Sequence, residues 1–357
     1  MYRRWSQILL LSFSAVVLAL VPNTEAQQVA GAAAKPAVAQ PLRWSVPPDR
    51  QVRVVIDADA AAETDDQVSI AHALLSSSVV VRGLIAAHFR NLPGFPVKST
   101  EENMQASYEE ILAILRLMKL EGAIPVKHGA GKPFTDPAVP VDSEGADLII
   151  EEAMATDPRP LFVLCQAHLT DLATAYVKEP RIAGRLTVVW IGGAAYPAGG
   201  GEFNQDGDRI AANIIMGSNI SLWQLPIPVY MLPRYGMVEF AEKVGQQGKL
   251  GRFLYGRVVR FVSKFRFVDE FFMCADDAAM GVLLQRWASW IIRDFEMRPA
   301  PNIAADGTYI HNGKNRPIRV YRSYDYRAGL EDLFAKLKAF AKGELKPNYG
   351  EKPKAEL

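Results

Sequence analysis

Residues 52–75 have the sequence VRVVIDADAAAETDDQVSIAHALL, in which four aspartates fall within ten positions. The run at residues 52–56 is short and rich in β-branched side chains, which predicts a buried strand. An amphipathic helix pattern follows the aspartates. Thr64 can cap this helix, so that Asp65 and Asp66 lie in its first turn. The stretch therefore predicts a strand, an acidic turn and a helix.

The acidic turn predicts a metal site. Carboxylates at the carboxyl end of a strand repel one another unless a cation lies between them, and a hard divalent metal is the natural counter-ion. In the alternative interpretation, two acids favour the dipole of the following helix and two cap the strand end. A helix dipole explains one or two acids better than four. The aspartates concerned are Asp57, Asp59, Asp65 and Asp66.

The acidic turn resembles the N-terminal signature of the calcium-dependent nucleoside hydrolase family. That signature is a strand followed by Asp-x-Asp, a short turn and an Asp-Asp pair that opens a helix. Here the turn at residues 60–64 holds five residues, whereas the common family form is shorter and contains Pro-Gly. The resemblance covers residues 50–340 approximately. It implies the nucleoside hydrolase fold and a bound Ca²⁺ ion.

A second segment strengthens the resemblance. Residues 202–212, EFNQDGDRIAA, look like the Glu-Phe-Asn block of the family, in which the Glu and the Asn hold sugar hydroxyls. Glu202 and Asn204 inherit that role by resemblance. The residue types alone support the same role, because a carboxylate and an amide beyond a strand end can form hydrogen bonds with the hydroxyls of a polyol.

A third segment supplies the remaining acid of the family pattern. Residues 274–280, CADDAAM, resemble a late helix start whose Asp is a metal ligand. Asp276 fits that spacing better than Asp277. The family often has a His immediately before this Asp, whereas Ala275 stands there in this chain. A leaving-group acid is therefore missing at this point.

Four more residues are expected near the site. Residues 162–173, FVLCQAHLTDLA, resemble a family strand and helix in which the backbone carbonyl of Gln166 faces the metal. His88 and Asn91 follow the second predicted strand, and His168 follows the third. Because ligands bind outside the carboxyl ends of such strands, these three side chains are candidates for contact with substrate.

The resemblance implies hydrolysis of the N-glycosidic bond of ribonucleosides, through a state with positive charge on the sugar. The metal ligands would be Asp59, Asp66, Asp276 and the carbonyl of Gln166, and the bound Ca²⁺ would activate a water whose proton Asp59 takes. Asp65 would hold a sugar hydroxyl. Three further aspartates are expected to contact these residues rather than the metal or the substrate, namely Asp57, Asp208 and Asp277.

Two other classes of protein fit part of the pattern. A phosphatase of the haloacid dehalogenase type also begins with a strand and Asp-x-Asp. It expects Thr or Val where Ala61 stands, and it leaves the later Asp pair unexplained. A calcium-dependent sugar- or nucleoside-binding protein without turnover fits the long turn and the missing His. Turnover of a riboside would distinguish the hydrolase from the binding protein, and phosphate release would identify the phosphatase.

The chain of 357 residues is expected to comprise four segments. Residues 1–26 combine a basic start with an apolar run too short to span a bilayer, which predicts a signal peptide and a periplasmic or secreted protein. An Ala- and Pro-rich linker at residues 27–50 precedes a nucleoside hydrolase-like domain at residues 51–345. A polar tail at residues 346–357 follows.

Strand-like and helical patterns alternate from residue 52 onward. This alternation predicts a Rossmann-like α/β fold, with a mainly parallel sheet and helices on both faces. A helical excursion with several aromatic residues is expected at residues 251–272. Strands are expected at residues 79–87, 161–164, 186–191 and 227–232, and helices at residues 102–120, 148–155, 172–176 and 278–292.

Composition limits the partners. A net charge of +1 gives no electrostatic reason to expect nucleic acid. No stretch beyond the leader is long and apolar enough to span a membrane, so a small-molecule riboside is the expected partner. The resemblance also implies a homodimer or homotetramer. Cys165 and Cys274 suggest a disulfide in an exported protein, although two buried free thiols are equally compatible.

Overall fold

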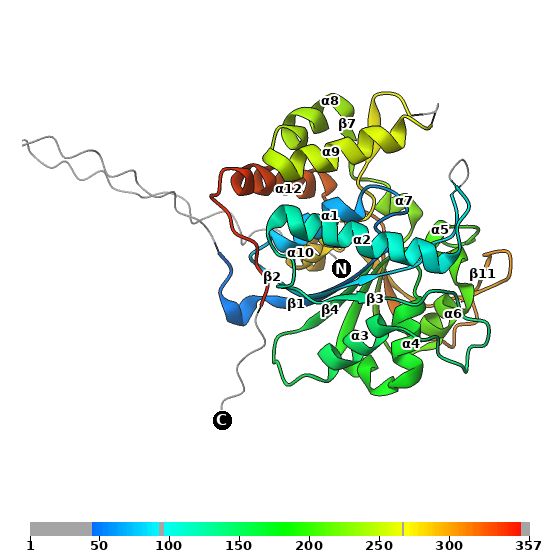
Figure 1. Cartoon of the computed structure of the whole chain (residues 1–357). Coiled ribbons are helices and arrows are strands. Elements are labelled where there is room, and N and C mark those ends of the chain that lie inside the picture. Colours follow the sequence, from blue (N-terminus) through cyan, green and yellow to red (C-terminus); the bar gives the residue numbers. More distant parts are fainter. Residues whose placement is uncertain (1–44, 93–95, 266–267, 351–357) are drawn as a thin grey trace, which may run out of the picture. The chain divides into compact units, whose positions relative to one another are not determined.

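A computed structural model of the protein describes residues 45–92, 96–265 and 268–350 (Figure 1). The predicted signal peptide at residues 1–26 lies outside these residues. So does the predicted linker at residues 27–50, apart from its last six positions.

The chain divides into two units, Met1–Trp44 and Ser45–Leu357. All the elements below belong to the second unit. Within the described ranges, no helix has the length and apolar character needed to cross a membrane.

An eight-stranded sheet forms the centre of this unit. Its strands are β1 Val52–Ala58, β2 Val79–Ala86, β3 Val126–His128, β4 Leu161–Cys165, β5 Leu186–Ile191, β6 Ser221–Leu225, β9 Phe295–Pro299 and β12 Pro317–Tyr321. They are ordered β3-β2-β1-β4-β5-β6-β12-β9. All neighbours are parallel except β9, which runs antiparallel to β12 at one edge. The predicted mainly parallel α/β fold is confirmed.

Strand β1 lies between β2 and β4 and is buried along its whole length. A strand covered on both faces can be apolar throughout, which explains its continuous β-branched run. Val54 and Ile56 belong to one hydrophobic core, whereas Val55 belongs to the other. Burial of each such side chain contributes about 1.5–3 kcal/mol. The strand is therefore a fixed base for the residues that follow it.

Helices cover both faces of the sheet. Those in the core of Val54 and Ile56 are α1 Asp66–Leu74, α2 Thr100–Met118, α10 Asp277–Leu284 and α12 Tyr326–Ala341. Those in the core of Val55 are α3 Glu144–Met154, α4 Thr170–Lys178 and α6 Arg209–Gly217. Figure 1 shows α1 and α10 on one side of the sheet and α3 and α4 on the other. Helices on both faces are thus confirmed.

Smaller elements complete the unit. Two short antiparallel pairs join β7 Arg234–Gly236 to β8 Phe271–Met273, and β10 Asn302–Ile303 to β11 Tyr309–Ile310. The remaining α-helices are α5 Phe203–Gly207, α7 Ile227–Tyr230, α8 Met237–Phe240, α9 Gly248–Val262 and α11 Arg286–Ile292. Short 3₁₀ or π segments occur at η1 Pro48–Arg50, η2 Pro180–Gly184 and η3 Ala241–Gly245.

The predicted strand at residues 227–232 is wrong. Strand β6 ends at Leu225, and a helical turn, α7, follows it. Pro226 and Pro228 lack the backbone N–H that a sheet ladder requires. The amide of Val229 instead donates to the carbonyl of Pro226 at 2.7 Å, which closes the turn.

Two helix predictions need smaller corrections. The predicted helix at residues 278–292 is two helices, α10 and α11, that are separated at Gln285. The predicted excursion at residues 251–272 is helical only as far as Val262, where α9 ends, and its last residues enter β8.

The predicted cap at Thr64 is also wrong. Asp65 occupies the N-cap position of α1, because the amide of Ser69 donates to the carbonyl of Asp65 at 2.9 Å. The hydroxyl of Thr64 is buried without a partner. Asp65 and Asp66 still open the helix, one position later than expected.

Residues beyond the predicted domain end pack against the sheet. The amide of Asn348 donates to the carbonyl of Leu74 at 2.7 Å. Tyr349 pairs with Val81 in an isolated parallel bridge. The first part of the polar tail is therefore attached beside β2.

Cys165 and Cys274 are both buried free thiols. Cys165 lies in the core of Val55, and Cys274 lies in the core of Val54 and Ile56. The two thiols are therefore on opposite faces of the sheet, which leaves the free-thiol interpretation and excludes the disulfide.

Candidate functional site

Most predicted site residues gather at the carboxyl ends of neighbouring strands. Asp59 follows β1, His88 follows β2 and Gln166 follows β4, while the loop after β5 leads to Glu202. These four strands are consecutive in the sheet and parallel. Parallel alignment therefore brings residues from distant parts of the chain to one edge.

Four buried carboxylates form the acidic cluster, which we define as Asp59, Asp65, Asp66 and Asp276. The amide of Asp276 donates to Oδ2 of Asp65 at 3.2 Å, so the starts of α10 and α1 are joined. Among the described residues, most other carboxylate oxygens of the cluster have no hydrogen-bond partner. They are Oδ2 of Asp59, Oδ1 of Asp65 and both oxygens of Asp66.

Burial raises the pKa of every member of the acidic cluster, and repulsion by neighbouring carboxylates adds to this for Asp59, Asp66 and Asp276. Burial is the largest cause for Asp59, and the charges of Asp66 and Asp65 add to it. Burial also dominates the raised pKa values of Asp66 and Asp276. For Asp65, hydrogen bonds from the backbone partly oppose the effect of burial. Several ionised carboxylates this close need a compensating positive charge.

The donor set of the acidic cluster suits a hard cation. In the described part of the chain, no group of three or more His, Cys, Asp or Glu side chains is already arranged to hold a metal ion. The cluster nevertheless offers only oxygen donors, and several of them are buried without a partner. Hard divalent cations take oxygen ligands of this kind. The chemistry of the residues therefore fits the predicted metal.

Glu63 is a further carboxylate at this site, and sequence reasoning missed it. It belongs to the five-residue turn at residues 60–64, and water reaches its side chain. Its pKa is nevertheless raised, first by the surrounding protein and then by the charges of Asp65, Asp59 and Glu202. The charges that act on Glu63 indicate that this exposed side chain lies beside the acidic cluster. An acid inside an unusually long turn was the signal that could have found it.

Gln166 connects three elements at the site. Its Nε2 donates to the carbonyl of Asp276 at 3.0 Å and to the hydroxyl of Ser69. Its own carbonyl accepts from Nδ2 of Asn204 at 3.3 Å, and Nδ2 also donates to the carbonyl of Ile191 at 2.9 Å. The end of β4 is thus tied to the starts of α1, α10 and α5. The predicted role of the Gln166 carbonyl as a metal ligand stays a prediction.

Glu202 caps helix α5. Its Oε1 accepts from the amide of Asn204 at 3.1 Å and from the hydroxyl of Tyr230 at 2.7 Å. Its Oε2 accepts from the amides of Gly193 and Gln205 at 2.7 and 2.8 Å. A carboxylate has about four acceptor sites, so Glu202 must release a partner before it can hold a sugar hydroxyl. Tyr230, which sequence reasoning missed, is the partner with a side-chain hydroxyl.

His88 and His168 form a buried pair whose rings are 5.2 Å apart, edge to face. Nδ1 of His88 lies 2.9 Å from the carbonyl of Ala130, and Nδ1 of His168 lies 3.0 Å from the carbonyl of Asn204. Burial lowers the pKa of His88 to about 4 and that of His168 to about 3. Both rings are therefore neutral near pH 7. Each Nε2 is a buried acceptor without a partner.

Asn91 is the one predicted site residue that lies on the surface. Its Oδ1 accepts from the amide of Lys98 at 3.0 Å, and its Nδ2 donates to the Lys98 carbonyl at 2.8 Å. The side chain thus closes its own loop rather than joining the acidic cluster.

The predicted supporting aspartates have three different settings. Asp57 is buried beside Asp171, and burial followed by the charge of Asp171 raises its pKa. Asp208 accepts from the amides of Ala211 and Phe134, both at 2.9 Å, and so caps α6. Asp277 lies 2.8 Å from Nδ1 of the buried His72. Asp277 directly follows Asp276 of the acidic cluster, and the charge of Asp59 also acts on Asp57.

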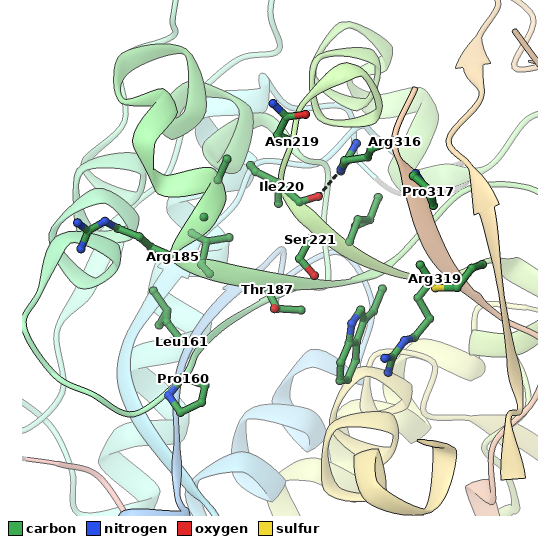
Figure 2. A pocket seen from close by; sticks show the side chains of 16 residues that line it. Pro160, Leu161, Arg185, Thr187, Asn219, Ile220, Ser221, Arg316, Pro317 and Arg319 are labelled. Atoms are coloured by element: carbon green, nitrogen blue, oxygen red, sulfur yellow. Dashed lines mark hydrogen bonds between the residues drawn. The ribbon is translucent and has the colours of Figure 1, made fainter. Parts of the chain in front are cut away.

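A cavity of about 580 Å³ lies at the opposite end of the sheet (Figure 2). Its lining includes Leu161, Leu186 and Ser221, which are the first residues of β4, β5 and β6. Figure 2 shows Arg316 donating to the carbonyl of Ile220 beside this cavity. None of its lining residues is a predicted site residue, so the cavity is separate from the acidic cluster.

Comparison with known proteins establishes the family. The model of the inosine-uridine preferring nucleoside hydrolase family matches residues 54–329. The chain belongs to this family. It is therefore a hydrolase that acts on N-glycosyl compounds, and its general activity is ribonucleoside hydrolysis. The family as a whole is metal-dependent, typically on Ca²⁺. This membership sets the phosphatase alternative aside.

Solved structures of nucleoside hydrolases share the fold of this family member. A plant nucleoside hydrolase is 19% identical with a TM-score of 0.64, and the match covers 82% of this chain and 100% of that one. A purine-preferring ribonucleoside hydrolase from Gardnerella vaginalis is 16% identical with a TM-score of 0.65, covering 81% and 99%. An inosine-uridine preferring nucleoside hydrolase from Bacillus anthracis is 17% identical with a TM-score of 0.54, with the same coverage. No curated protein matches the chain.

Proposed function

We propose that the protein hydrolyses the N-glycosidic bond of ribonucleosides, or of related ribosides, with Ca²⁺ as cofactor and Asp59 as general base. The observation that carries this proposal is the acidic cluster. Its carboxylates are buried at the carboxyl ends of the strands, and their oxygens largely lack partners. Such an arrangement is costly in a purely structural role, because buried charges need compensation.

The residues proposed to hold the cation are Asp59, Asp66, Asp276 and the backbone carbonyl of Gln166. When bound, Ca²⁺ would lower the pKa of a nearby water and would chelate the cis-diol of a ribose. Gln166 already contacts the backbone of Asp276. The pKa of Asp276 responds to the charges of Asp66 and Asp59, which supports a shared environment.

The protein's own groups supply the remaining chemistry. Asp59 takes the proton of the attacking water. Asp65 and Asn204 orient sugar hydroxyls. Glu202 joins them when its bond with Tyr230 is exchanged for a bond with the substrate. Positive charge that develops on the sugar is stabilised by the surrounding carboxylates.

This chain lacks the His that often precedes the metal-binding Asp of the third segment in the family, so that His cannot protonate the leaving group. Ala275, which precedes Asp276, has no acidic side chain that could donate a proton to the leaving group. His88 and His168 are neutral, with Nε2 as acceptor, so they are suited to accept a hydrogen bond rather than to protonate a leaving group. We therefore propose a substrate whose aglycone leaves readily, or an acid supplied by another loop.

Release of ribose from a panel of ribonucleosides and nitrophenyl riboside tests this proposal. We expect reducing sugar to appear, to be lost when a calcium chelator is added, and to return when Ca²⁺ is restored. Nitrophenyl riboside should be the fastest substrate, because its leaving group needs no protonation. Release that is unaffected by the chelator would contradict the metal-dependent mechanism.

Retention of Ca²⁺ and of nucleoside, with no release of ribose from any substrate in the panel, would contradict the proposed substrate class.

We also propose that the protein is exported and that the leader is removed near Ala26. N-terminal sequencing of the protein from the periplasmic or culture fraction tests this. An intact N-terminus on a protein that stays in the cytoplasm would contradict it.

A further inference from the structure

Helix α11 presents a large apolar surface to solvent. Trp287, Trp290, Ile291 and Ile292 are each between 66% and 69% exposed. Spacings of three and four residues place the first three on one face of the helix. A single exposed apolar residue is ordinary, whereas a contiguous patch of large ones marks an interaction site. We call these four residues the α11 patch.

The opposite side of α11 is anchored to the domain. Ser289 is buried, and its hydroxyl donates to Oδ2 of Asp294 at 3.1 Å. The carbonyl of Asp294 accepts from the amide of Arg322, which follows β12, at 2.8 Å. The helix is thus fixed at the edge of the sheet. Exposure of the α11 patch follows from its outward position rather than from a loosely attached helix.

The surroundings of the α11 patch are positively charged. Arg286 lies within the helix, Arg293 follows its last residue, and Nη2 of Arg322 donates to the carbonyl of Arg293 at 3.2 Å. Among the described residues, none of these arginines has a carboxylate partner at ion-pair distance. Of the acids that follow the helix, Asp294 is buried with its Oδ2 bonded to Ser289, and Glu296 pairs with Arg298 at 2.9 Å.

We propose that the α11 patch docks the protein on an anionic lipid surface as a peripheral contact. Tryptophan prefers the interface between water and lipid, and exposed isoleucines contribute apolar area to bury there. Arginines at the margin pair with anionic headgroups. This differs from the expectation of no membrane partner, which considered only segments that could span a bilayer.

A second copy of the chain is a less suitable occupant. A two-fold contact through the α11 patch would set the same unpaired arginines against one another, and like charges at an interface are unfavourable. The neighbouring edge strand β9 carries the Glu296–Arg298 pair. Charged side chains on an edge strand discourage pairing with another strand.

Co-sedimentation with vesicles tests the proposal. The protein without its proposed leader, residues 27–357, is mixed with vesicles of phosphatidylcholine alone or with added phosphatidylglycerol. We expect binding to the anionic vesicles and at least a tenfold loss in the double variant Trp287→Ser/Trp290→Ser. Arg293→Gln and Arg322→Gln should each weaken binding about fivefold. Every variant has the same N-terminus, so any contribution of residues 27–44 is common to all.

The matched control is Val238→Ser, which removes an apolar side chain that is 82% exposed on α8. We expect this variant to bind like the parent, and all variants to unfold at the same urea concentration. Equal binding by the parent and the double tryptophan variant would overturn the proposal. So would a parent that sediments without vesicles as a dimer which the double variant converts to monomer, because the α11 patch would then be a contact between copies.

Discussion

Asp59 illustrates how a single residue combines several demands. It is buried, its Oδ2 has no partner, and burial together with Asp66 and Asp65 raises its pKa. Each of these features is unfavourable for a structural aspartate. They become useful when a cation occupies the acidic cluster, since the carboxylate is then both a ligand and a base.

Replacement of Asp59 by Ala is expected to lower kcat for riboside hydrolysis by at least about a hundredfold, since a positioned base contributes 10²–10⁴-fold. The fold should persist, because the change removes a repelled carboxylate from a buried site. Ribose release and urea unfolding, the latter in the presence of chelator, measure the two effects. Asp142→Ala alters an exposed carboxylate and should leave both unchanged. Parent-like activity in a folded Asp59→Ala protein would refute the mechanism.

The cysteines provide a second test at the scale of residues. Cys165 and Cys274 lie in separate cores as free thiols. Unfolding in denaturant without reductant should expose about two reactive thiols per chain to a thiol reagent, because no bond joins them. The folded protein should react slowly, since both groups are buried. Absence of reactive thiols after unfolding would show that a disulfide forms despite this placement.

At the scale of elements, α5 and α6 show how a strand end is fitted to its neighbours. Glu202 caps α5 and Asp208 caps α6, so two carboxylates of one sequence block fix two successive helices. The last residue of α5, Gly207, leaves room for the ring of His168 after β4. A Cβ at Gly207 would lie 1.9 Å from that ring.

Gly207→Ala is therefore expected to destabilise the protein by about 1–3 kcal/mol, as overpacking of a buried contact does. His168→Ala should relieve the clash, so that the double variant loses less stability than the two single variants added together. Urea unfolding of the four proteins measures this coupling. Gly217→Ala is the matched control, because nothing lies within 4 Å of a Cβ there. Strict additivity would contradict the proposed close packing.

At the scale of the whole molecule, two hydrophobic cores on opposite faces of the sheet bury polar groups along with apolar ones. His88 is an example, since burial lowers its pKa to about 4 from an ordinary value of 6.5. The unfolded chain therefore binds a proton at this residue more readily than the folded protein does. The shift has no effect on stability above pH 6.5, where both states are neutral, and it increasingly destabilises the fold as the pH falls from 6.5 towards 4.

The pH dependence of unfolding is expected to change in His88→Asn. In the parent, this residue should lower stability by about 1.4 kcal/mol for each pH unit below its unfolded pKa. The difference in unfolding free energy between parent and variant should shrink accordingly between pH 6.5 and 5. The buried carboxylates have raised pKa values, so their effect on stability runs in the opposite direction as the pH falls. Both proteins contain them, so the comparison cancels this effect. Parallel pH profiles would show that His88 is not held neutral.

Sequence alone determined the elements whose periodicity and end signals agree. The β-branched run of β1, the acidic turn after it and the alternation of strand and helix patterns predicted a parallel α/β sheet with acids at its carboxyl edge. Residues 227–232 were misjudged because β propensity competes with two prolines that cannot donate ladder bonds. The family resemblance carried Asp59, Asp66 and Asp276 to one site, although more than 200 positions separate the first from the last.

Only the tertiary structure decided which partners each side chain meets. The saturation of Glu202 by its four partners, the position of Glu63 beside the acidic cluster and the separation of the cysteines all depend on strand order and on which face a residue occupies. The exposure of α11 depends on where the chain turns beyond α10. Local sequence fixes backbone preference within a few residues. Contacts between distant segments arise from packing of the whole sheet with its helices, so no local pattern contains them.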